Sequence, residues 1–326
     1  MINFFKSLNP FNILWLAIVS FALRAGYLFN IPGKIEFAFA DPFARLLLSA
    51  PSPLDPTINV FLAGIIVFVQ ALLLNHLVNH FNLLGKPTFL PALMYITVSC
   101  LFKNFLVLSA PLLCNFLLIW MLFKLLSFYK SNDAKSAAYD LGLIVALGSI
   151  IYLPFIYFFL AIWIGLIIFK PFNWRELIAG VIGYITVFFF LAVYYFWNDS
   201  LGQFYNIWQP LSTKFSDGNS INYYNYLVLI PVVIILLLCF FTLQKNFFKS
   251  YVQVRKSFQF LFIVSLIGGF SFYNKAAFHL SHFLLCVVPV SVFFSYYFLN
   301  SKRKWFYETL FVILLISIVY FQFNTF

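Results

Sequence analysis

Five charged residues are crowded into one stretch of a chain that otherwise carries few charges. Arg24, Lys34, Glu36, Asp41 and Arg45 all fall within 24–48, although the 326 residues include only 20 basic and 9 acidic ones. Arginine and lysine hydrogen-bond anionic groups such as phosphate, and a nearby carboxylate can exchange protons with a hydroxyl. This stretch is therefore the first place to look for a functional site.

Asp41 and Arg45 are four residues apart, so they share one face of a helix that begins at this Asp-Pro pair. Asp41 is suited to cap such a helix, and Pro42 is suited to its first position. One interpretation is a capped helix that lies on the membrane surface. The other is that these charges belong to a functional site.

Arg24 lies about two-thirds of the way through the first apolar run, 11–29. An arginine at the centre of a bilayer costs roughly 2.5–3.5 kcal/mol on insertion scales. The side chain can avoid that cost by extending to the interface. Alternatively, it faces a buried anionic group such as a lipid phosphate.

Four further basic positions are candidates for the same site. His279 and His282 are three apart in HLSH, shortly after Lys275, and would share a helix face. They are compatible with a metal site, a polar structural network or contact with a phosphorylated ligand. Lys103, in the turn FKNF, is either an exposed turn residue or part of a basic ring with Arg24, Arg45 and Lys275.

The composition identifies an integral membrane protein, because 63% of the residues are hydrophobic, 9% are charged and the mean hydropathy is +0.97. The net charge of +11 does not indicate nucleic-acid binding, since the basic residues are spread between apolar runs. The four cysteines lie inside apolar runs without a CxxC pair, and no metal or other cofactor is expected.

Apolar runs predict a single all-α integral membrane domain over 1–326, a polytopic bundle of about eleven spans (range about 10–13). One or two interfacial helices are expected in the outer loops, 30–57 and 198–222. The expected spans are 11–29, 58–78, 89–102, 105–123, 141–153, 155–169, 177–197, 223–242, 258–273, 276–299 and 305–323.

The positive-inside rule predicts the orientation. With a cytoplasmic N-terminus, 14 of the 20 basic residues fall in cytoplasmic segments and five fall outside, leaving Arg24 in the membrane. The two long loops then face outward, which indicates that the protein works at its outer face.

The order of these features resembles that of the GT-C type membrane glycosyltransferases, which use polyprenyl-phosphate sugars. The resemblance is carried by LRAGYLFNIP followed by FADPFARLLL, by the lysine turn before SAPLLCNFLLIWMLFKLLSFYK, and by HLSHFLLCVVPVSVFFSYYFL. It departs from the family in the proline after Asp41 and in histidines where an arginine is common. The chain also looks like an uncharacterised family of bacterial multi-pass membrane proteins.

The GT-C resemblance implies an inverting transferase at the outer face of the bacterial inner membrane, with a lipid-phosphate sugar as donor. It implies that Asp41 is the catalytic base. It also implies that a set of basic residues binds the leaving lipid phosphate, namely Arg24, Arg45, Lys103, Lys275, His279 and His282. The expected partners are membrane lipids and a polyprenyl-phosphate sugar.

Two other function classes compete with the transferase. A transporter of lipid-linked intermediates would need a polar path through the spans. A non-catalytic envelope assembly or interaction protein would tolerate substitution of Asp41 and depend on its aromatic outer loop.

Overall fold

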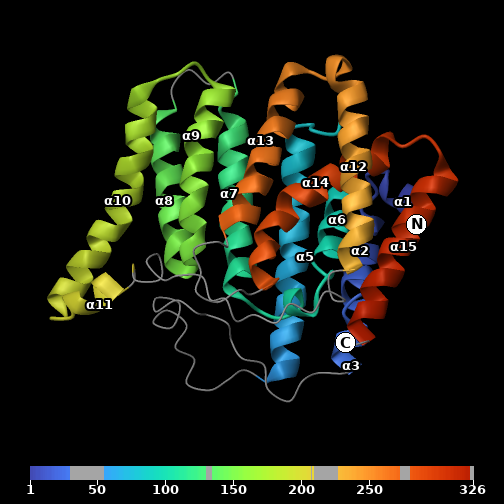
Figure 1. Cartoon of the computed structure of the whole chain (residues 1–326), viewed down its shortest axis with the longest axis horizontal. Coiled ribbons are helices and arrows are strands. Elements are labelled where there is room, and N and C mark those ends of the chain that lie inside the picture. The colour runs from blue at the N-terminus through green and yellow to red at the C-terminus, as the bar shows by residue number, and fades with distance from the viewer. Residues whose placement is uncertain (30–54, 130–133, 207, 209–226, 272–279, 324–326) are drawn as a thin grey trace.

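The computed structural model describes residues 1–29, 55–129, 134–206, 208, 227–271 and 280–323, and all regular structure in these ranges is helical. The elements run in chain order as α1 (Ile2–Phe5), α2 (Phe11–Ala22), α3 (Ala25–Phe29), α5 (Pro56–His80), α6 (Leu90–Val98), η1 (Lys103–Phe105), α7 (Ala110–Ser127), α8 (Lys135–Ile151), η2 (Leu153–Tyr157), α9 (Phe158–Phe169), α10 (Trp174–Trp197), α11 (Leu201–Asn206), α12 (Leu229–Asn246), η5 (Phe247–Lys249), α13 (Val252–Phe270), η7 (Leu280–Phe283), α14 (Leu284–Asn300) and α15 (Lys304–Phe323). The long helices stand side by side in one bundle (Figure 1).

Six helical segments in the described ranges are long and apolar enough to cross a membrane. They are Pro56–His80, Ala110–Ser127, Trp174–Trp197, Leu229–Lys249, Leu280–Asn300 and Lys304–Phe323. The apolar segments Phe11–Ala22 and Leu153–Phe169 are shorter. Each of the eleven expected runs overlaps a helix, but a count of eleven spans stays a prediction.

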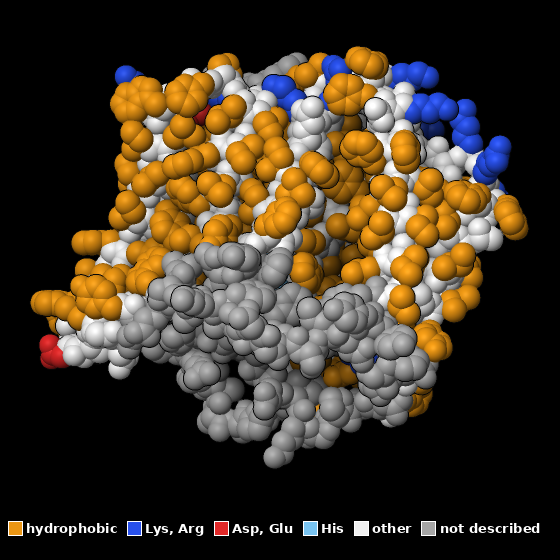
Figure 2. Space-filling model, viewed as in Figure 1, with side chains coloured by type: hydrophobic (Ala, Val, Ile, Leu, Met, Phe, Trp, Pro, Cys, Tyr) orange, Lys and Arg blue, Asp and Glu red, His pale blue; other side chains and the backbone are white. Residues whose placement is uncertain are grey.

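Large apolar side chains cover much of the face of the bundle that Figure 2 shows. On α10, Phe190 is 66% exposed and Trp197 is 84% exposed, and on α12, Phe241 is 63% exposed. In water such a surface would cause aggregation, whereas lipid tails accept it. Together with the six long helices, this surface is that of a multi-pass membrane protein.

Local sequence signals explain several helix boundaries. Asp55 caps α5 by accepting a hydrogen bond from the Thr57 amide at 3.1 Å, and Pro56 takes the first helical position. Asn173 caps α10 in the same way through the Arg175 amide, at 3.2 Å. Pro154 lies in η2, where the chain turns from α8 into α9, because proline cannot continue the α8 hydrogen-bond pattern.

Helices α8 and α10 approach each other closely, and glycines make this possible. A Cβ on Gly142 would overlap the Gly180 carbonyl oxygen, and a Cβ on Gly183 would overlap the Tyr139 carbonyl oxygen. Small residues let helix backbones approach each other in membranes, where packing drives association. The α8–α10 contact therefore depends on the absence of side chains at these positions.

Basic residues gather at one end of the bundle, along the upper edge in Figure 2. We call this the basic end; α5, α7, α9 and α12 finish there, and α8, α10, α13 and α15 begin there (Figure 1). Thirteen of the 15 described basic residues belong to it: Lys6, Lys86, Lys124, Lys135, Lys170, Arg175, Lys245, Lys249, Arg255, Lys256, Lys302, Arg303 and Lys304. The other two, Arg24 and Lys103, lie toward the opposite end, which we call the Arg24 end.

Candidate functional site

Arg24 occupies the break between α2 and α3. Its backbone amide bonds to the Phe21 carbonyl at 3.1 Å, and its carbonyl accepts from Tyr27 and Leu28. The side chain is only 1% exposed, so it does not extend to a surface of the described structure. A Cβ on Gly64 would lie 3.4 Å from Arg24 Cδ and 3.5 Å from Nε, so this glycine of α5 leaves room beside the guanidinium.

The Arg24 guanidinium is only partly paired. Nη1 donates to the Leu106 carbonyl at 3.0 Å, whereas Nε and Nη2 are buried with no hydrogen-bond partner in the described structure. Within the described residues, the titratable groups that interact with it electrostatically are Cys100 and Tyr95, and thiols and phenols are neutral near pH 7. A buried cation without a counter-charge is costly, so this arrangement calls for an anion.

The turn that receives Arg24 is held from two sides. Leu106 accepts from Arg24, and two residues later the Leu108 amide donates to Asn59 Oδ1 of α5 at 2.8 Å. Asn59 Nδ2 and the Ser109 hydroxyl are also buried without a described partner. Three side chains that border the 106–109 segment thus carry unpaired groups able to donate hydrogen bonds, which an oxygen-rich anion would accept.

Lys103 begins η1, three residues before Leu106. Its carbonyl accepts from the Leu106 amide at 3.1 Å, so it belongs to the turn that Arg24 holds. Its side chain is partly exposed, and partial burial lowers the pKa of its ammonium group from the usual value. Lys103 is the second described cation at the Arg24 end.

His282 lies in η7, which packs against η1 and α7. Its Nε2 is 2.9 Å from the Gly268 carbonyl oxygen and 3.1 Å from Ser271 Oγ, and its Nδ1 is 2.7 Å from the Tyr152 hydroxyl. A carbonyl only accepts, so Nε2 carries a hydrogen, and in a neutral imidazole Nδ1 then accepts from the Tyr152 hydroxyl. Both ring nitrogens therefore join η7 to α13 and to the start of η2.

Of the predicted site residues, Arg24, Lys103 and His282 lie in segments that meet at the Arg24 end, through Leu106 and through the η1–η7 contact. Asp41, Arg45, Lys275 and His279 lie outside the described residues. Within the described ranges, no group of three or more His, Cys, Asp or Glu residues could hold a metal ion.

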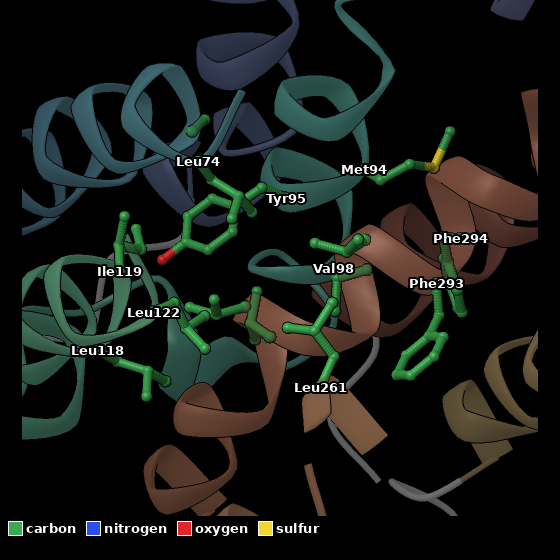
Figure 3. Packing of buried hydrophobic residues seen from close by; sticks show 14 of the residues in the cluster. Leu74, Met94, Tyr95, Val98, Leu118, Ile119, Leu122, Leu261, Phe293 and Phe294 are labelled. Carbon is green, nitrogen blue, oxygen red and sulfur yellow. The ribbon is translucent and has the colours of Figure 1, made fainter. Parts of the chain in front are cut away.

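A network of buried polar side chains joined by hydrogen bonds was not predicted from the sequence. Gln70 donates to the Leu112 carbonyl at 2.7 Å and accepts from the Tyr95 hydroxyl at 2.8 Å, and Asn115 donates to Tyr95 and to the Leu284 carbonyl. Figure 3 shows the Tyr95 ring between Leu74 of α5 and Ile119 of α7. Asn59 and Gln70 are eleven residues apart, about three helical turns, so both lie on one face of α5. This spacing of two polar residues could have been recognised in the sequence.

The helical fold, its apolar exterior and the buried polar groups define a multi-pass membrane protein. At one end it has a cation that the described residues pair only in part. Residues 40–326 match a family model described as "Family of unknown function (DUF6427)", and the chain belongs to that family. Arg24 precedes the matched range. Searches of curated proteins and of solved structures find no match.

Proposed function

We propose that this protein is a membrane glycosyltransferase-like protein that binds the phosphate of a polyprenyl-phosphate-linked sugar at the Arg24 end. The observation that supports the proposal is the buried Arg24 guanidinium, whose Nε and Nη2 have no partner in the described structure. A phosphate offers oxygens that accept two parallel hydrogen bonds from one guanidinium, and its charge offsets the buried cation.

In the proposed reaction, Asp41 removes the proton from an acceptor hydroxyl. The hydroxyl oxygen forms a bond to the anomeric carbon of the sugar, and the bond from that carbon to the phosphate oxygen breaks. The polyprenyl phosphate leaves with the negative charge, which Arg24 and Lys103 stabilise. A single displacement of this kind inverts the anomeric centre.

We place the Arg24 end at the outer face of the bacterial cytoplasmic membrane. Thirteen of the 15 described basic residues lie at the opposite end, and cytoplasmic segments of membrane proteins are rich in lysine and arginine. The N-terminus is then cytoplasmic, since Met1 pairs with Glu308 near the start of α15, at the basic end.

The second candidate function is a non-catalytic envelope assembly or interaction protein. It is favoured by His282, whose ring nitrogens bond to Tyr152, Ser271 and Gly268 of the chain itself. A residue expected to bind the phosphate thus has a structural role. On this alternative, Arg24 would hold an anion only to complete the fold.

Binding of a polyprenyl phosphate to the purified chain tests the proposal. Native mass spectrometry of the delipidated protein with added polyprenyl phosphate should show a one-to-one complex. We expect Arg24→Gln to weaken this complex about tenfold or more, because a hydrogen-bonded charge pair is lost. The matched control, Lys86→Gln, removes a cation from the basic end and should bind as the wild type does. Equal binding by all three proteins would contradict the proposal.

A further inference from the structure

A groove opens between α12 and α13 near the basic end. Both helices pack against α14 rather than closely against each other, and the space between them has a volume of about 480 Å³. Figure 2 shows the surface hollowed between these two helices. The apolar side chains that line it include Leu243, Phe247, Val254, Phe258, Phe262 and Phe293. Phe293 of α14 lies at its base and is 7% exposed.

Arg255 stands at the polar mouth of this groove. Its guanidinium carbon lies 5.2 Å from the centre of the Phe247 ring, which holds the planar cation beside the opening. The Arg255 side chain takes part in no ion pair or hydrogen bond within the described structure, so its donors are available to a ligand. Gln244 and Gln259 add exposed amide groups to the lining.

The charged residues around the mouth of the groove are basic. Lys245 and Lys249 are close to Arg255 along the chain at the same end, and no described carboxylate lines the groove. Lipid acyl chains gain nothing by leaving a bilayer for an apolar groove, so the lining alone selects no lipid. Selection must come from the head group, and basic residues at this depth favour anionic lipids.

We propose that this groove binds an anionic glycerophospholipid, with one acyl chain between α12 and α13 and the phosphate at Arg255. This site is separate from Arg24, which lies toward the other end of the bundle, so it does not depend on the proposed function. It would anchor the α12–α13 hairpin to the lipid leaflet at the basic end.

Native mass spectrometry of the full chain, delipidated in detergent and titrated with phosphatidylglycerol or phosphatidylcholine, tests this site. We expect preferential binding of phosphatidylglycerol by the wild type. Arg255→Gln should weaken that binding about fivefold, the factor expected for one basic group at an anionic lipid surface. Lys256→Gln is the matched control, because it removes the neighbouring charge outside the groove lining, and it should bind within twofold of the wild type.

A second pair of variants tests occupation of the groove. Gln259→Trp places a large ring at an exposed lining position and should weaken phosphatidylglycerol binding at least fivefold, whereas Gln253→Trp, outside the lining, should not. Circular dichroism and gel filtration check that each variant is folded. Equal losses in Arg255→Gln and Lys256→Gln would show a diffuse surface charge effect and overturn the proposal. Unchanged binding by Gln259→Trp would overturn it as well.

Discussion

Arg24 and Leu106, 82 positions apart in the chain, are joined by a hydrogen bond of 3.0 Å from Nη1 to the carbonyl oxygen. The bond fixes one side of the guanidinium against the turn that follows Lys103. Nε and Nη2 remain buried and unpaired in the described structure. In the part of the chain that the structure describes, the fold thus orients the cation but pairs only one of its three nitrogens.

Replacing Arg24 tests whether its guanidinium is unpaired in the ligand-free protein or paired with another group of the chain. If the guanidinium awaits an external anion, Arg24→Met should leave the thermal stability of the ligand-free protein unchanged or raise it. The variant loses one hydrogen bond, worth about 1 kcal/mol, but removes an uncompensated buried charge. Thermal unfolding in detergent without added lipid phosphate measures this.

A fall of about 3–5 kcal/mol in the unfolding free energy of Arg24→Met would mean that a carboxylate of the chain pairs with Arg24. Lys86→Met is the matched control, because it removes an exposed cation at the basic end. Its stability should stay within about 0.5 kcal/mol of the wild type.

The α8–α10 contact predicts a sharp difference between two glycines. Gly142→Ala should destabilise the protein by about 1–3 kcal/mol, because the new methyl group would overlap the Gly180 carbonyl oxygen. Gly269→Ala, in α13, meets nothing within 4 Å and should be neutral or stabilising by up to about 1 kcal/mol, since alanine favours helix. Similar melting temperatures for the two variants would contradict the packing described for α8 and α10.

The orientation can be measured by labelling single cysteines from the outer side of intact cells. In a background where Cys100, Cys114, Cys239 and Cys286 are replaced, a cysteine at Ser216 should react with an impermeant maleimide. A cysteine at Ser301, beside the basic residues that precede α15, should react only after the membrane is opened. Labelling of Ser301→Cys but not of Ser216→Cys in intact cells would reverse the orientation and place Arg24 toward the cytoplasm.

Asp41 lies outside the described residues, and its role stays a prediction that one substitution can test. Asparagine caps a helix about as well as aspartate, so Asp41→Asn should be nearly neutral if Asp41 is only a cap. A general base cannot be replaced by an amide, and its loss typically lowers a rate by about 10²–10⁴-fold. We expect Asp41→Asn to accumulate normally in the membrane but to lose transfer of sugar from a polyprenyl-phosphate donor. Normal transfer by the variant would favour the envelope assembly protein.

Most of the helices could be predicted from the sequence. An apolar run near membrane length must pair its own backbone polar groups in the bilayer, and a helix does this. The division at Pro154 followed from the missing amide of proline, and η2 lies there. Length and hydropathy alone did not establish how many helices cross the membrane. The segment Phe11–Ala22, for example, ends just before Arg24 and is shorter than a full span.

The candidate site was only partly readable. Arg24 stood out as a charge inside an apolar run and Lys103 as a charge between two apolar runs, and they meet at the same turn. For His282, the three roles considered from the sequence could not be separated, because Tyr152 and Gly268 are distant in the chain and only the fold brings them to the ring. Asn59 was missed because a neutral amide inside an apolar run gives a weak signal by itself.

The most direct test of the account is a cryo-electron microscopy structure of the full chain in a lipid nanodisc with an added polyprenyl phosphate. The account predicts phosphate density with oxygens about 2.7–2.9 Å from Nε and Nη2 of Arg24. A carboxylate of the chain, such as that of Glu36 or Asp41, bonded to these two nitrogens with no phosphate beside them would contradict it.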